Sequence, residues 1–122
     1  AVAFTGVDEC DFRHNTILRP DKWIFRILQE RTEPRFERCG NVRFNNNLVI
    51  FERAKVRVVS NIGPHTRPET FRFRNNHWFA ADAPERSKPE LPTVEPNAVH
   101  GVDPEIDPKT KRPNAKLPAG QR

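Results

Sequence analysis

The chain has 122 residues, a formal net charge of +5 and twelve prolines, and only 35% of its residues are hydrophobic. This length accommodates one domain. No apolar run approaches the roughly 18 residues that a membrane-spanning helix needs, which predicts no membrane partner. The two cysteines, Cys10 and Cys39, are too few for a disulfide framework.

Aromatic residues divide the chain into two parts. Every Phe and Trp lies before residue 80, whereas residues 84–122 contain none and hold eight of the twelve prolines. A segment without large apolar side chains cannot offset the entropy that is lost when it becomes ordered. We therefore predict a compact basic domain over residues 1–83 and an extended proline-rich arm without its own core over residues 84–122.

Residues 20–31 have the pattern of an amphipathic helix. A proline and an aspartate at the start suit a helix N-terminus. Apolar side chains then recur at helical spacing, at Trp23, Ile24, Ile27 and Leu28. A strand is the less favoured alternative, because Ile24 and Leu28 would then face away from the core.

After Gly40 the hydrophobic period changes to two. Apolar and charged residues alternate around residues 42–44, 55–58 and 70–74, and residues 48–51 form a short continuous apolar run. The Asn-rich segments 45–47 and 75–77 predict turns, the second of them a hairpin turn. The expected fold is α+β, with one amphipathic helix packed on a small, mostly antiparallel sheet of four or five strands, followed by the extended arm.

The alternating strands predict a basic face. Six apolar side chains are expected to face the core: Val42, Phe44, Val56, Val58, Phe71 and Phe73. Five cations then share the opposite surface: Arg43, Lys55, Arg57, Arg72 and Arg74. Such a surface attracts nucleic-acid phosphates or an acidic protein. The alternative is an ordinary solvated face, balanced by Glu52 and Glu69.

Metal-ligating residue types occur in one scattered set: Cys10, His14, Cys39 and His65. Only Cys10 and His14 have a useful spacing, and the sequence has no Cys-x2-Cys pair. We therefore predict no metal site and no cofactor. A disulfide between Cys10 and Cys39 is the alternative to two reduced thiols.

Acid–base chemistry has a candidate set in Glu52, His65 and His77, with arginines to stabilise phosphorane charge. Nothing in their spacing fixes these residues together. The sequence also lacks glycine-rich phosphate loops and the common hydrolase motifs. We therefore expect no enzyme, and a small metal-independent ribonuclease or toxin domain is the alternative.

The arm carries two candidate interaction features. Residues 86–92, RSKPELP, fit a basic-x-x-Pro-x-x-Pro ligand of SH3-type grooves. Small apolar side chains are spaced along the arm as candidate anchors on neighbouring subunits: Val94, Val99, Val102, Ile106 and Leu117.

From these features we expect a non-enzymatic structural subunit of a large assembly, a virion or a ribonucleoprotein particle, with a virion slightly favoured. Its basic face would dock on nucleic acid or acidic protein, and its arm would wrap neighbouring subunits. An adaptor whose arm is bound by an SH3-type groove is a further alternative.

Overall fold

The computed structural model describes residues 2–29 and 39–105, and this part of the chain is built from strands and two single-turn 3-10 helices. Nine of the strands form three successive coils of three: β1 (Val2–Thr5), β2 (Asp8–Arg13) and β3 (Thr16–Leu18); β4 (Lys22–Leu28), β5 (Gly40–Asn45) and β6 (Leu48–Phe51); β7 (Val56–Ile62), β8 (Arg72–Arg74) and β9 (His77–Ala80). The remaining described elements follow or connect these coils: β10 (Val99–His100), η1 (Pro68–Thr70) and η2 (Pro84–Arg86).

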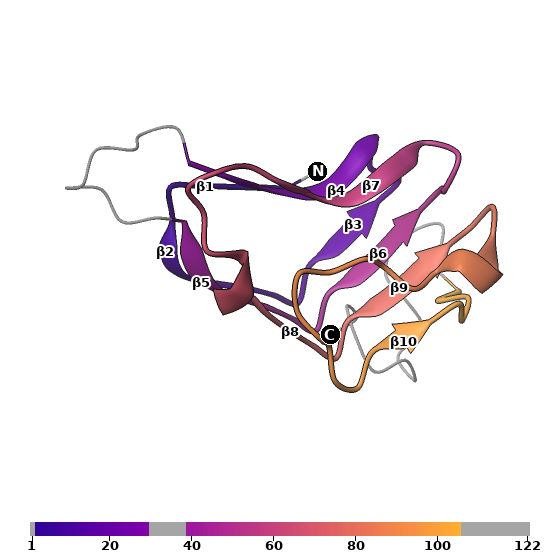
Figure 1. Ribbon diagram of the computed structural model, residues 1–122. Coiled ribbons are helices and arrows are strands. Elements are labelled where there is room, and N and C mark those ends of the chain that lie inside the picture. The colour runs from indigo at the N-terminus through magenta and orange to yellow at the C-terminus, as the bar shows by residue number, and fades with distance from the viewer. Residues whose placement is uncertain (1, 30–38, 106–122) are drawn as a thin grey trace.

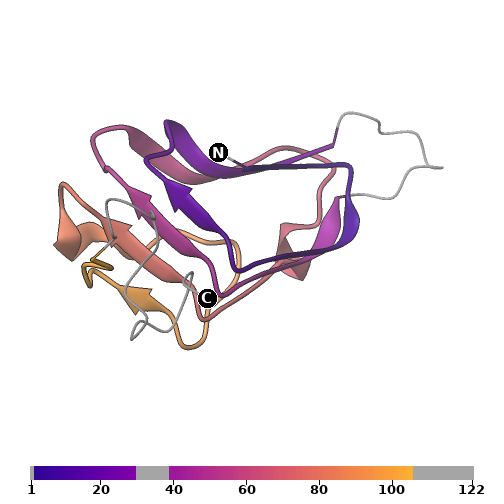
Figure 2. The ribbon, with the colours of Figure 1, turned by 180° about the vertical axis from the view of Figure 1, so that it is seen from behind.

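Strands β1 to β6 each pair in parallel with the strand three positions further along the chain, and β9 pairs in parallel with β10. This pairing gives three sheets, with the orders β1-β4-β7, β2-β5-β8 and β3-β6-β9-β10. Figures 1 and 2 show the three sheets as the walls of a tube around which the chain winds. The fold is therefore a three-sheet parallel β-helix, a solenoid in which each coil stacks on its neighbours.

The β-helix corrects the expected α+β fold. Residues 22–28 form strand β4, not a helix, and no α-helix or antiparallel strand pair occurs in residues 2–29 and 39–105. Trp, Ile and Phe favour strands, and this preference prevails over the helical spacing. The register of β4 on β7 shifts between Lys22 and Trp23, and Ile24 and Phe25 are both fully buried. The strand therefore does not alternate strictly, which is why its pattern resembled that of a helix.

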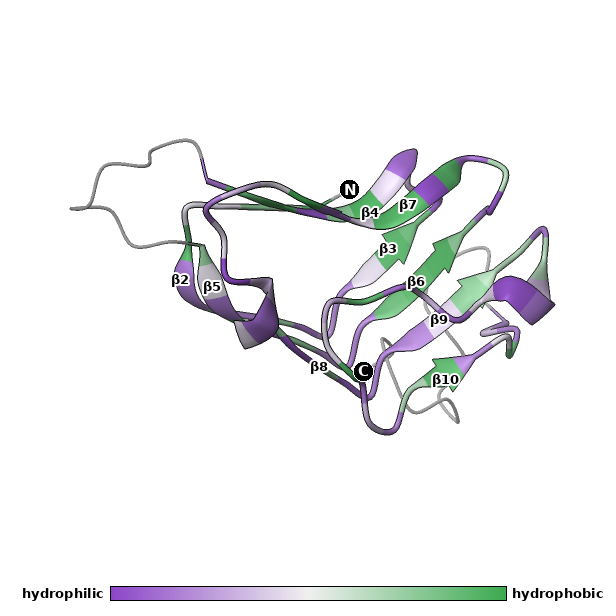
Figure 3. Ribbon diagram, viewed as in Figure 1, coloured by the Kyte–Doolittle hydropathy of each residue, from purple (hydrophilic) through white to green (hydrophobic). Residues whose placement is uncertain are grey.

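The core is an aromatic stack along the axis of the solenoid. Phe12 stacks on Phe44 at 5.1 Å between ring centroids, and Phe44 lies 5.6 Å from Phe73 in the next coil. Five of the six expected core residues are buried, which confirms them: Val42, Phe44, Val56, Phe71 and Phe73. The prediction for Val58 is wrong, because this side chain is 50% exposed and Val59 is buried in its place. In Figure 3 strand β6 is apolar along its whole length.

The Asn-rich segments are corners between two sheets. One residue at each corner adopts a left-handed conformation: His14 (φ 56°), Asn46 (φ 55°), Asn75 (φ 56°) and Asn97 (φ 58°). Asn tolerates this conformation better than most residues, which suits it to a corner that recurs in every coil. The turn at residues 45–47 is thus present. Residues 75–77 do not make the expected hairpin, because the strands they join, β8 and β9, belong to different sheets.

The residue after three of these corners is an asparagine, and the three form a ladder. The backbone N–H of Asn15 donates to Oδ1 of Asn47 (2.9 Å), and that of Asn47 donates to Oδ1 of Asn76 (2.8 Å). The side-chain amide of each later rung donates back to the previous coil, from Asn47 to the carbonyl of Phe12 and from Asn76 to that of Phe44. These bonds satisfy amides that are fully buried at Asn47 and Asn76.

Residues 84–105 pack on the third coil. The guanidinium of Arg53 lies 5.0 Å from the centre of the Phe51 ring and donates to the carbonyls of Arg86 and Lys88, each at 2.7 Å. Strand β10 then extends the sheet next to β9. The described part of the arm is thus held by its own domain through backbone carbonyls, which need no aromatic side chains. Residues 106–122, with the expected anchors Ile106 and Leu117, lie outside the described residues.

Candidate functional site

The outer face of the β2-β5-β8 sheet brings arginines from three coils together. Residues that pair across the three strands form two rows, which we call the rungs of this sheet. Asp11, Arg43 and Arg72 form one rung, and Arg13, Asn45 and Arg74 form the other. The residues between them, Phe12, Phe44 and Phe73, point inward and form the aromatic stack. Neighbouring strands lie about 4.8 Å apart, so side chains of one rung are adjacent. The four arginines are all exposed.

The arginines of the second and third coils surround a hollow of about 300 Å³, which we name the basic hollow. Its lining combines the sheet with two residues of the arm: Arg43, Asn45, Arg72, Phe73, Arg74, Val94 and Pro96. No carboxylate is among these residues. The arm thus supplies one wall, and the sheet supplies the cations.

Asp11 is the acidic residue that opposes these cations. One of its carboxylate oxygens lies 3.9 Å from Nε of Arg43 and 3.8 Å from Nε of Arg13. Pairs this long between exposed groups contribute little and leave the cations able to bind a ligand. Arg72 is held differently, because its Nη1 donates to the carbonyl of Glu69 at 2.7 Å. One guanidinium of the hollow is therefore oriented by the backbone.

The predicted basic face is only partly assembled. The structure brings Arg43, Arg72 and Arg74 together, as expected. It places Arg57 on β7, which belongs to another sheet, and Lys55 in the turn before β7, 3.7 Å from Glu52. The expected set of five is corrected on this point, because the solenoid distributes successive strands among three walls.

Sequence reasoning missed Arg13 and Asn45. A repeat could have revealed both, because Phe-Arg-His-Asn at residues 12–15 recurs as Phe-Asn-Asn-Asn at 44–47 and as Phe-Arg-Asn-Asn at 73–76. The Asn rungs of these segments are 32 and 29 residues apart. A period of this length is a sign of a solenoid, and it aligns the second residues of the three segments, Arg13, Asn45 and Arg74.

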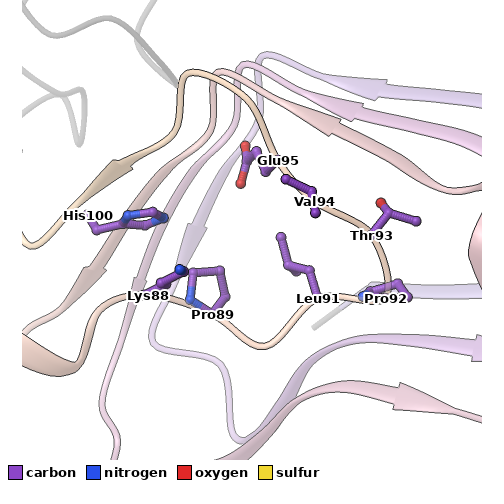
Figure 4. A pocket seen from close by; sticks show the side chains of 8 residues that line it. All are labelled: Lys88, Pro89, Leu91, Pro92, Thr93, Val94, Glu95 and His100. Carbon is purple, nitrogen blue, oxygen red and sulfur yellow. The ribbon is translucent and has the colours of Figure 1, made fainter.

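A second hollow of about 390 Å³ lies within the arm itself. Figure 4 shows the side chains that line it, namely Lys88, Pro89, Leu91, Pro92, Thr93, Val94, Glu95 and His100. Burial lowers the pKa of His100, and the charge of Lys88 lowers it further. Val94 lines both hollows, Glu95 lines this one, and Pro96 lines the basic hollow. The two hollows are therefore adjacent and are separated by Val94 and Glu95.

Glu95, in the arm, has a half-buried carboxylate. Its Oε1 accepts a hydrogen bond from the indole of Trp78 (2.8 Å), and its Oε2 accepts two from Asn76. Burial raises the pKa of Glu95 above its ordinary value, and the three donors oppose that rise. The carboxylate faces the end of the Asn ladder, so its role is structural.

The residues of the acid–base alternative do not converge. His77 is fully buried, and its Nε2 lies at the carbonyl of Val102. Glu52 follows the far end of β6 and pairs with Lys55, and His65 is exposed in the loop after β7. Burial lowers the pKa of His77, and a ring with no exposed surface cannot contact a substrate.

The metal-ligand set is equally dispersed. The described residues contain no group of three or more His, Cys, Asp or Glu side chains that could hold a metal ion. Cys10 and Cys39 are free cysteines, so no disulfide joins them. Cys39 is fully buried, its thiol lies 3.2 Å from the carbonyl of Phe4, and burial raises its pKa.

The candidate anchors and the SH3-type motif of the arm differ in their exposure to solvent. Val94 is 92% exposed and Val102 is 48% exposed, whereas Val99 is half-buried in β10. In the RSKPELP segment, Ser87 and Pro89 are buried against the solenoid. One proline of the SH3-type motif is therefore covered by the protein's own domain.

Comparisons with protein-family models, with curated proteins and with solved structures found no match. Among the described residues, no helix has the length and apolar character that crossing a membrane requires. The functional argument therefore depends on the geometry of the solenoid and its basic hollow.

Proposed function

We propose that the protein is a non-enzymatic structural component of a nucleoprotein assembly and that it docks on nucleic-acid phosphates through the basic hollow. The observation that carries this proposal is the register of the sheet, which pairs Arg43 with Arg72 in one rung and places Arg13 and Arg74 at the ends of the next. A planar guanidinium matches a phosphate in a bidentate manner, and it is more weakly hydrated than an ammonium group. Four of them on one flat sheet suit a chain of phosphates.

Contacts to the backbone are favoured over contacts to the bases. The exposed large apolar side chains of the described residues are all aliphatic: Leu18, Val58, Ile62, Val94 and Val102. Proteins that hold single strands through their bases stack them on aromatic side chains. An aliphatic surface with clustered arginines supports phosphate binding that is largely independent of base sequence.

The ends of the sheets support a role within a larger assembly. Strands β1, β2 and β3 are each at the edge of their sheet, and among the described residues each pairs on one side only. A strand edge presents unpaired N–H and C=O groups that can pair with another chain. We propose that neighbouring subunits dock there.

Salt dependence of binding to a single-stranded oligonucleotide tests the proposal. The double variant Arg72→Ala plus Arg74→Ala should reduce the slope of log affinity against log salt by about 1.4, since each lost phosphate contact contributes about 0.7. The matched control is Lys55→Ala plus Arg57→Ala, which removes the same charge from another part of the molecule and should leave the slope unchanged. Equal effects of the two variants, or no binding at all, would refute the proposal.

A further inference from the structure

Asn45 carries a buried hydrogen-bond acceptor without a partner. Its Oδ1 is enclosed by the protein, and it accepts no hydrogen bond in the described structure. The residue lines the basic hollow and sits in register between Arg13 and Arg74. A buried polar atom without a partner costs free energy, and such atoms are rare enough to require an explanation. A ligand that donates a hydrogen bond would supply one.

The surroundings of Asn45 define the chemistry of that ligand. Arg43, Arg72 and Arg74 line the same hollow and can only donate hydrogen bonds. A ligand that fits must therefore offer anionic acceptors to the arginines and, close to them, one donor to Asn45. Because Oδ1 has almost no accessible surface in the free protein, the side chains that cover it must move when the ligand binds.

We infer that the basic hollow selects RNA over DNA, with Oδ1 of Asn45 accepting a hydrogen bond from a ribose 2′-hydroxyl. This inference rests on the proposed function. In RNA each backbone phosphate has a neighbouring 2′-hydroxyl, which can donate, whereas DNA has none. The same hollow then binds the phosphate through its arginines and distinguishes the sugar through its one free acceptor. An acidic protein would satisfy the arginines with carboxylates, and a donor to Asn45 would then have to come from a separate group of that protein.

Three oligonucleotides of the same sequence isolate the hydroxyl. A twelve-residue oligouridylate is compared with its 2′-deoxy and 2′-O-methyl forms, so that the bases and phosphates are identical. The 2′-O-methyl form keeps the sugar conformation of RNA but has lost the donor. The RNA should bind about threefold to tenfold more tightly than both other forms, the effect of one hydrogen bond.

Two variants separate this inference from the proposed function. Asn45→Leu, and Asn45→Ala should the leucine not fold, are expected to abolish the difference in affinity between RNA and the other two oligonucleotides. The double variant Arg72→Ala plus Arg74→Ala should weaken all three oligonucleotides by the same factor. Circular dichroism checks that each variant is folded.

The other possible results distinguish a failure of this inference from a failure of the proposed function. If the three oligonucleotides bind equally and the arginine variant weakens them all, the inference is refuted and the proposed function stands. A preference for RNA that survives both Asn45 variants also refutes the inference, because the discrimination then lies elsewhere. Failure of every oligonucleotide to bind refutes the proposed function, and the inference with it.

Discussion

Glu95 receives both amide donors of Asn76 on one carboxylate oxygen, the backbone N–H at 2.9 Å and the side-chain Nδ2 at 2.7 Å. Val99 pairs with His77, so the residues that precede them, Ala98 and Asn76, occupy equivalent positions. The next corner of the solenoid therefore has an alanine where the earlier corners have an asparagine. Alanine cannot accept the N–H of Asn76. The carboxylate of Glu95 therefore replaces the missing rung, and the arm terminates the ladder.

Replacing Glu95 with alanine should destabilise the fold. The change leaves the two donors of Asn76 and the indole of Trp78 without their acceptor, at a cost of about 3 kcal/mol in the free energy of unfolding. Urea unfolding measures this loss. The control is Glu90→Ala, which removes an exposed carboxylate of the same arm and should cost less than about 1 kcal/mol. Equal losses for the two variants would show that Glu95 does not terminate the ladder.

Asn47, the middle residue of the Asn ladder, should also contribute to the stability of the fold. Asn47→Ala removes the acceptor of the Asn15 N–H and a donor to the carbonyl of Phe12, in a fully buried position. We expect a loss of about 2–3 kcal/mol in the free energy of unfolding, again by urea titration. Asn61→Ala, a half-buried position on β7, should change stability by less than about 1 kcal/mol. A tolerated Asn47→Ala would contradict the ladder.

Stability should fall in mild acid because of His77. Burial lowers its pKa in the folded protein, so the unfolded chain takes up a proton first as the pH falls through the ordinary histidine value of 6.5. Proton uptake by the unfolded chain alone favours unfolding. Stability is therefore greatest above that pH and declines below it, until the folded protein is protonated as well.

The test for His77 compares pH profiles, not absolute stabilities. The free energy of unfolding of the wild-type protein should decline more steeply between pH 7 and pH 5.5, a range of about one unit around the ordinary value, than that of His77→Gln. Both proteins retain Glu95, whose raised pKa acts in the opposite sense, and that effect cancels in the comparison. Parallel profiles would show that His77 is protonated equally in both states.

Much of the core was predictable from the sequence, but its topology was not. The alternation around Phe44 and Phe73 correctly identified inward and outward residues, because period two is a property of any strand. The same alternation followed by an Asn-rich turn occurs in hairpins and at solenoid corners. Only the recurrence of Phe-x-x-Asn at 29 and 32 residues distinguishes them.

Local sequence patterns likewise predicted only part of the candidate site. Arg72 and Arg74 lie on one strand, so local alternation placed them together correctly. The expectation that Arg57 shares this face requires a single sheet, but its strand, β7, belongs to a different sheet from β5 and β8. The position of Asn45 between two arginines depends on stacking across coils, which no local pattern encodes.

The central claim is that nucleic acid binds at the basic hollow. It is tested most directly by recording the NMR signals of the arginine Nε–H groups while oligouridylate is added to the intact protein. The account predicts that the signals of Arg43, Arg72 and Arg74 shift in proportion to binding, while that of Arg57 on the neighbouring sheet stays in place. Shifts centred on Arg57, or the absence of shifts at the hollow when the oligonucleotide is bound, would contradict it.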